Sequence, residues 1–381
     1  MDPNRWRRKD IADKLWIIKK GKNDSMMNKK KVFQALLIFL ITVSISCAAY
    51  SSTYNRGQIY LYGEAHSVDS ILDEEFQLWS EYYHRDGLRY LFVELPFYSA
   101  EFLNLWMETD SDELLNELWK ELRGTDGGTS LLKDFYRQIK RECPETIFCG
   151  TDVGHQYTTT GERYLKYLRG HGQVDSVYYK RAQEVINQGK SFYHKNGMDA
   201  RAYRENKMVE NFVWKFNQLK GESIMGIYGS AHIGNGNKSY SFSINPNMAT
   251  QLDEKYPGEI HTEDLAKNYD DFVPCEKDVL VIKGKGYPAW MWGEVPVDIK
   301  GKPYNYAKVW ELREGSEDFE NIPVGEWNIL DSSYPCTVGY GKIYILDFYN
   351  EDAFGERHLF RSDKKSMEDG SIVTRELIFK E

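Results

Sequence analysis

The sequence predicts an α/β protein with a mainly parallel central sheet flanked by helices, followed by a β-rich C-terminal module. Four short apolar runs recur along the chain, and each ends in a turn followed by a polar residue. Segments with helical periodicity lie between these runs. Beyond residue 283 the pattern changes to alternating strands joined by Gly and Asp turns. Strands that alternate with helices favour a parallel sheet, whereas consecutive alternating strands favour an antiparallel one.

The N-terminus, residues 1–48, is predicted to be an extension that carries an export segment. Lys29, Lys30 and Lys31 precede an apolar segment of 15 residues that reaches to Cys47. This segment is shorter than the ~20 residues of a membrane-spanning helix, but it has the layout of a secretory signal. Translation from Met26 or Met27 would give that signal ordinary proportions.

Cys47 leaves three alternatives open. The residues before it resemble a bacterial lipoprotein box with Ser44 where leucine is usual, and Ser46, Cys47 and Ala48 also fit an ordinary cleavage site. An uncleaved anchor is the third possibility. All three predict an extracytoplasmic protein, secreted or attached to a membrane through its N-terminus.

The charge of the rest of the chain argues against a nucleic-acid partner. Residues 47–381 carry 38 Lys and Arg against 54 Asp and Glu, a net charge of −16. Such a surface repels phosphate backbones, whose binding depends on basic side chains. The four cysteines that follow Cys47 are too few for a disulfide scaffold and form no CxxC pair.

The predicted core occupies residues 51–283 and begins with strands that are buried on both faces. Their apolar character is continuous rather than alternating, which is typical of a parallel sheet covered by helices. In chain order the runs are QIYLYGEAH, LRYLFVELP, ETIFCGTD and SIMGIYGSAH.

Helical patterns occupy the intervals between these strands. After the first strand, Ser67 is expected to cap a helix that ends near Gly87, and Ser111 to cap one that stops at Gly124. The segments TSLLKDFYRQIKREC, GERYLKYLRG and VDSVYYKRAQEVINQG also have helical periodicity. A long helix is predicted over residues 199–220, with Met208 and Phe212 on its apolar side.

Residues 284–381 are predicted to form a small antiparallel β module. The segment DVLVIKGKG just before it is expected to be the last strand of the core sheet. The module is interpreted as an appended interaction or substrate-covering domain, or as an extension of the sheet without a role of its own.

Polar residues that follow the predicted strands indicate a site. Ligands of parallel sheets bind at the carboxyl ends of the strands, where His66, Glu94, Asp152 and His232 would converge. For Asp152 a turn role is favoured over a functional one. His155 and His194 are interpreted as surface histidines.

Two chemistries are open to such a cluster. Imidazoles with the carboxylates of Glu64, Glu94 or Asp152 would hold a divalent transition metal such as Mn, Co or Zn, whose bound water becomes a nucleophile near neutral pH. Without metal, a histidine base oriented by a carboxylate would activate water for ester or amide hydrolysis.

The residues resemble a known superfamily. The paired G-x-x-H motifs at 63–66 and 229–232, the glutamate of the second strand and RENKMVENFVW are similar to the group that joins Tiki/TraB metalloproteases, erythromycin esterases and ChaN-like haem-binding proteins. Esterase-type members resemble R-D-x-x-M-A-x-N in that helix; here Glu205 replaces Asp and Val209 replaces Ala. The resemblance covers residues 57–283.

The resemblance implies a catalytic site of His66, Glu94 and His232 with Glu64 and Arg204 beside them, and a metal held by the two histidines and Glu94. It implies an exported hydrolase that cleaves a small-molecule ester or a peptide. A metal-assisted reaction is favoured over a metal-free one. The alternative is a non-catalytic ChaN-like lipoprotein that binds haem through histidine or tyrosine. An interaction protein with an inactive site is a third possibility.

Overall fold

The computed structural model describes residues 57–234, 246–266, 274–297, 299, 301–330, 333–350, 353–366 and 372–379. The predicted export segment and Cys47 lie outside these residues. Within the described ranges, no helix is both long enough and apolar enough to cross a membrane.

A five-stranded sheet forms the centre of the first part of the molecule, and each of its strand pairs is parallel. The strand order is β3-β2-β4-β1-β5. The strands are β1 (Ile59–Glu64), β2 (Tyr90–Pro96), β3 (Ile147–Asp152), β4 (Ile224–Gly229) and β5 (Ile260–Asp264). The first four are the predicted apolar runs, so the predicted parallel sheet is confirmed. Strand β5 was not predicted, because its side chains are mostly exposed at the edge of the sheet and form no apolar run.

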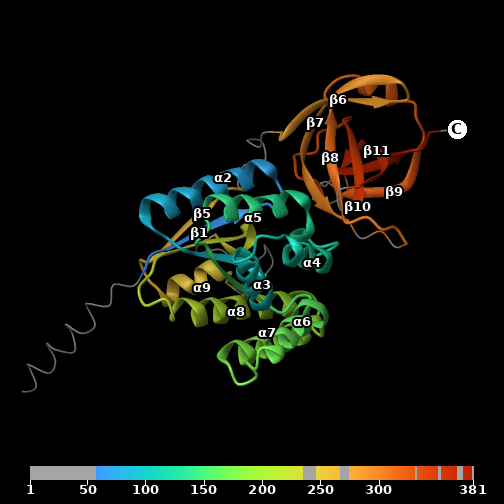
Figure 1. Cartoon of the computed structure of the whole chain (residues 1–381). Helices are drawn as coiled ribbons and strands as arrows, with labels where there is room; N and C mark the ends of the chain where they lie inside the picture. Colours follow the sequence, from blue (N-terminus) through green and yellow to red (C-terminus); the bar gives the residue numbers. More distant parts are fainter. Residues whose placement is uncertain are drawn as a thin grey trace, which may run out of the picture. The chain divides into compact units, whose positions relative to one another are not determined.

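Helices cover both faces of this sheet, as Figure 1 shows for α2 and α5 on one face and α8 and α9 on the other. The helices are α2 (Asp69–Glu81), α3 (Phe97–Met107), α4 (Glu113–Glu121), α5 (Ser130–Glu142), α6 (Glu162–Gly170), α7 (Val177–Tyr193), α8 (Gly197–Phe216) and α9 (Met248–Lys255). Burial on both faces explains why the strands read as continuous apolar runs.

Two predicted helix caps are wrong. Ser67 does not cap α2, because its hydroxyl bonds the Thr129 hydroxyl at 2.6 Å and its backbone adopts a φ of 60°. Ser111 lies one residue before the N-cap of α4, which is Asp112, although its Oγ accepts from the Glu113 N–H at 3.4 Å. The end of the first helical segment at Gly87 is confirmed, since this glycine has a φ of 75° and follows a single π-helical turn.

The second part of the molecule is an antiparallel sheet of order β6-β7-β8-β10-β11-β12-β9. Its strands are β6 (Glu276–Ile282), β7 (Lys285–Pro296), β8 (Tyr306–Leu312), β9 (Val324–Leu330), β10 (Ile343–Asn350), β11 (Ala353–Ser366) and β12 (Ile372–Leu377). The predicted β-rich C-terminal module is confirmed. We call this sheet the β module.

The prediction that DVLVIKGKG closes the core sheet is wrong, because these residues form a hairpin within the β module. Lys283 and Gly284, with φ values of 49° and 81°, make the two-residue turn between β6 and β7. A turn with two positive φ values matches the twist of antiparallel strands. Val279 and Val281 are exposed, so the apolar run does not mark a doubly buried strand.

Candidate active site

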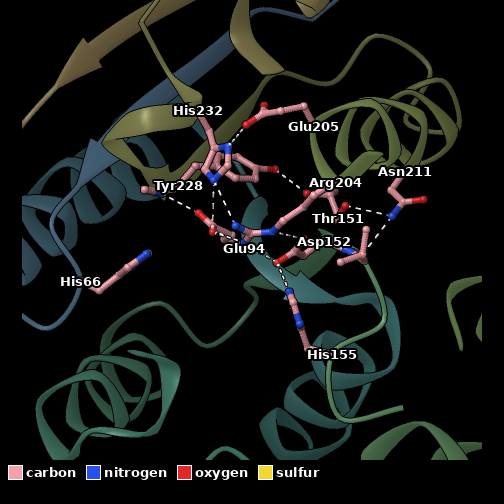
Figure 2. Close-up of polar contacts among 12 residues, drawn as sticks. His66, Glu94, Thr151, Asp152, His155, Arg204, Glu205, Asn211, Tyr228 and His232 are labelled. Atoms are coloured by element: carbon pink, nitrogen blue, oxygen red, sulfur yellow. Dashed lines mark hydrogen bonds and ion pairs between the residues drawn. The ribbon is translucent and has the colours of Figure 1, made fainter. Parts of the chain in front are cut away.

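Four neighbouring strands deliver polar side chains to one end of the parallel sheet. His66 follows β1, Glu94 lies in β2, Asp152 ends β3, and His232 lies in the short 3-10 turn after β4. Parallel strands present their carboxyl ends at one edge, so residues far apart in sequence meet there. Figure 2 shows these side chains grouped around Arg204, with the His66 ring beside the group.

Arg204 of α8 joins two of these strands through its guanidinium fork. Its Nε donates to Asp152 Oδ1 at 3.0 Å and its Nη2 donates to Asp152 Oδ2 at 2.7 Å. The same Nη2 donates to Glu94 Oε1 at 2.5 Å. Asp152 is 1% exposed, so the guanidinium supplies the countercharge that water would otherwise provide. Burial opposes ionisation, yet Arg204 holds the pKa of Asp152 well below its usual range.

Glu94 is bound from both sides. Its Oε2 accepts a hydrogen bond from the backbone N–H of Gly229 at 2.6 Å, and its Oε1 lies 3.5 Å from His232 Nε2. Although burial works against the charged form, the positive charges of His232 and Arg204 hold the pKa of Glu94 well below its usual range. Glu94 is therefore a fixed carboxylate.

His232 is buried between two carboxylates. Its Nδ1 lies 2.7 Å from Glu205 Oε1, and Glu205 is only 1% exposed. Burial lowers the pKa of His232, but the charge of Glu94 and the hydrogen bond to Glu205 outweigh burial and raise this pKa to about 9. An imidazolium at this position is part of the charge balance of the network.

His66 forms a separate dyad with Glu64. Its Nδ1 lies 2.9 Å from Glu64 Oε1. Burial lowers the pKa of His66, but the charge and hydrogen bond of Glu64, with the charge of Glu94, raise it to about 10. A Cβ added at Gly229 would lie 3.2 Å from His66 Nε2 and 3.4 Å from Glu94 Oε2. Gly229 thus leaves room for the ring beside Glu94, with Nε2 free to meet a substrate or water.

Asn211 fixes the position of helix α8 along the sheet. Its amide Nδ2 donates to the carbonyl oxygens of Thr151 and Asp152, each at 3.0 Å. Arg204 lies two turns earlier on the same face, as their spacing of seven residues predicts. This contact fixes the height at which Arg204 reaches the strand ends.

The structure brings together Glu64, His66, Glu94, Arg204 and His232, the predicted site residues. Asp152, expected at the same edge of the sheet, joins them, as do His155 and Glu205. Asp152 has the predicted turn role, because its Oδ1 accepts a hydrogen bond from the Val153 N–H at 2.7 Å. It also binds Arg204. His155, interpreted as a surface histidine, lies 3.1 Å from Asp152 Oδ2 through its Nε2.

Glu205 is the third added residue. From the sequence it is identified only as the residue that replaces Asp in the helix motif, and in the structure it is buried against His232. The sequence held a signal for this position, because Glu205, Met208 and Phe212 are spaced three and four residues apart. Residues so spaced share one helix face, and Met208 and Phe212 are apolar.

Two cavities meet at these side chains. One has a volume of about 310 Å³ and the other of about 750 Å³. Glu64, His66, Glu94 and Arg204 line both, whereas His232 lines only the larger. The His66 side chain is 34% exposed and that of His232 is 4% exposed, so His66 is the more accessible of the two histidines.

Two of the three predicted metal ligands, Glu94 and His232, are engaged by Arg204 in this structure. The Arg204 guanidinium bonds Glu94 Oε1, and its Nη1 lies 3.4 Å from His232 Nε2. A cation there would face a fixed positive charge and would compete for the same lone pairs. Among the described residues, no group of three or more His, Cys, Asp or Glu side chains is arranged to hold a metal ion.

The comparisons with known proteins are limited to distant structural likeness. No protein family matches the sequence, and no curated protein matches it. A protein from Bacillus cereus is similar in structure at 13% identity and a TM-score of 0.40, over 55% of this chain and 65% of that chain.

Two further solved structures show likeness of the same order. A succinoglycan biosynthesis protein is 13% identical with a TM-score of 0.38, over 54% of this chain and 65% of that chain. An erythromycin esterase mutant in its open conformation is 12% identical with a TM-score of 0.40, over 55% of this chain and 69% of that chain. Likeness at this level carries no argument about activity.

Proposed function

We propose that this protein is a hydrolase in which His66, oriented by Glu64, activates water for attack on an ester or amide carbonyl. The observation that supports the proposal is the bond between His66 Nδ1 and Glu64 Oε1 at 2.9 Å, beside two cavities that His66 lines. A carboxylate bound to one ring nitrogen fixes the tautomer and leaves the other nitrogen to act as a base.

In the proposed reaction, His66 Nε2 removes a proton from water as the water oxygen forms a bond to the carbonyl carbon. The carbonyl π electrons move to oxygen and give a tetrahedral oxyanion. This oxyanion collapses, the bond from carbon to the leaving oxygen or nitrogen breaks, and the leaving atom takes the proton from His66. Water is consumed, and one acid and one alcohol or amine are released.

The network around Arg204 has a supporting part in this proposal. Arg204 and His232 line the same cavity as His66, and their positive charge favours a developing oxyanion there. Glu94, held by Arg204 and Gly229, keeps these cations in place. Because Glu94 and His232 of the predicted metal set are engaged by Arg204, we propose no step through a metal, and metal assistance becomes an outcome that the experiment detects.

The test compares hydrolysis of matched p-nitrophenyl esters and p-nitroanilides by wild type, His66→Gln and His194→Gln. His194 is the matched control, because it is exposed and its Nδ1 contacts only the Lys190 carbonyl among the contacts described. Loss of general-base catalysis lowers turnover by about 10²–10⁴-fold. We expect this loss in His66→Gln alone. Equal activity in all three proteins would overturn the proposal.

The haem-carrier alternative is separated by the same set of variants. Titration of wild type with haem would give a Soret shift that His66→Gln abolishes if the carrier reading holds. A Soret shift in a protein without hydrolytic activity would replace the hydrolase proposal.

Export through the N-terminal segment remains a proposal of its own. Lys29–Lys31, the apolar segment and Cys47 carry it. Mass spectrometry of the mature N-terminus would show cleavage near residue 47 with or without a lipid adduct, and an intact N-terminus beginning at Met1 would contradict cleavage.

A further inference from the structure

The β module forms one wall of the larger cavity, and the candidate active site forms the other. The site wall carries His66, Glu94, Arg204 and His232. The opposite wall is apolar, and its side chains include Val295, Val297, Ile299, Trp327, Ile329 and Phe348. A cavity of 750 Å³ with one reactive and one apolar wall has the size and character of a small-molecule site.

The apolar wall is held against the active-site part by contacts of β7. Glu294 is 1% exposed, and its carboxylate accepts from Ser130 N at 2.8 Å, Ser130 Oγ at 2.6 Å and Leu131 N at 3.1 Å. These donors are the first groups of α5, where a carboxylate is favoured. The Glu294 N–H also donates to the Ser67 carbonyl at 3.2 Å. The wall therefore has a fixed position over the strand ends.

The cations that line the cavity are already paired with carboxylates of the protein, His66 with Glu64 and His232 with Glu205. The described residues that line it include four carboxylates, Glu64, Glu94, Asp126 and Glu294, and a single Lys or Arg, Arg204. Arg204 is already bound to Asp152 and Glu94. A substrate carboxylate or phosphate would meet no uncommitted arginine or lysine among these residues.

We propose that the β module binds an extended apolar, uncharged acyl group, so that the substrate class is neutral carboxylic esters with a medium-length acyl chain. This inference rests on the proposed function for the bond that is cleaved. The acyl chain lies against the apolar wall while its carbonyl meets His66. The leaving group extends into the smaller cavity, where Glu75, Asp126 and Tyr136 supply polar atoms.

Chain-length preference is the property to measure. Each methylene transferred from water into an apolar wall is worth roughly a three- to fourfold factor. Partial burial of six added methylenes predicts that wild type prefers p-nitrophenyl octanoate over p-nitrophenyl acetate by at least about tenfold in kcat/KM.

Ile329→Trp and Leu330→Trp form a matched pair of variants. Both residues lie in β9, where successive side chains point to opposite faces. Ile329 lines the cavity, whereas Leu330 is exposed and does not. We expect Ile329→Trp to lower the ratio of kcat/KM for the octanoate ester to that for the acetate ester by at least about tenfold, and Leu330→Trp to leave this ratio unchanged.

A binding assay keeps this inference distinct from the hydrolase proposal. The neutral dye N-phenyl-1-naphthylamine should bind the full chain and be displaced by 1-octanol but not by octanoate anion, and Ile329→Trp should weaken its binding. Dye binding with this pattern in a protein that hydrolyses no ester would overturn the proposed function while supporting an apolar binding site. An acetate preference in wild type, or equal effects of the two tryptophan variants, would overturn the inference.

Discussion

Replacement of Arg204 by methionine should destabilise the protein strongly at neutral pH. The side chain makes three charge-assisted contacts, two to Asp152 and one to Glu94. Removal of one partner from a buried ion pair costs about 3–5 kcal/mol, because the remaining charge is left without a countercharge. Two carboxylates lose their partner here, but Arg204 borders both cavities, where water can enter, so we expect the lower end, about 3 kcal/mol.

The pH dependence of this effect provides the sharper test. In the wild type, Arg204 holds the pKa values of Asp152 and Glu94 low. Such groups stabilise the fold above their unfolded pKa values of about 3.9 and 4.3, and this stabilisation is lost as the pH falls through the lower folded values. The variant lacks this stabilisation, so its deficit should be largest near pH 7 and shrink progressively as the pH falls and the two carboxylates become protonated.

The assay is urea denaturation of wild type, Arg204→Met and Arg141→Met at several pH values. Arg141 is the matched control, because it is an exposed helix arginine paired with Glu142. Surface pairs of this kind contribute about 0–1 kcal/mol. A deficit below about 1 kcal/mol for Arg204→Met at pH 7, or one unchanged down to pH 3, would refute the buried network.

Three further predictions concern single side chains. If His66 is the base, kcat/KM for an uncharged ester should rise with pH towards the His66 pKa of about 10. Glu64→Gln should move this rise to lower pH, because it removes the charge that raises the pKa. A pH profile of Glu64→Gln identical to that of wild type would contradict the dyad. Burial and the charge of Glu64 raise the pKa of Glu75, so Glu75 destabilises the fold increasingly as the pH rises above about 4.3. In thermal unfolding, Glu75→Gln should therefore gain stability relative to wild type from pH 4 to pH 8. A difference that does not change with pH would count against a neutral buried acid. Gly229→Ala should lower kcat/KM by at least about tenfold, because the added Cβ would contact the His66 ring. An unchanged melting temperature would show that the fold is intact. Full activity of the variant would show that catalysis does not need the His66 ring in its present position.

The strands and the location of the site were predictable because their signals are local. Runs such as LRYLFVELP are continuous, and strands buried on both faces require this pattern. Once the strands are parallel, His66, Glu94 and His232 must emerge at one edge. The arginine of the long helix followed from its position seven residues before Asn211, on the same face.

The remaining features depend on contacts that no local pattern encodes. The β6–β7 hairpin follows from the positive φ values at Lys283 and Gly284, which outweigh the apolar run before them. Ser67 and Glu294 find their partners across the chain, at Thr129 and at Ser130. The apolar wall over the site arises only when the β module packs against the first residues of α5.

The most direct test of the account is hydrolysis after removal of metal. Wild type and His66→Gln would be dialysed against a chelator, checked for residual metal by elemental analysis, and assayed with p-nitrophenyl octanoate. Water activation by the His66–Glu64 dyad predicts that wild type keeps its kcat/KM and that His66→Gln loses at least about 100-fold. Loss of wild-type activity on dialysis, with recovery on addition of manganese, cobalt or zinc, would contradict the account and place a metal at the site.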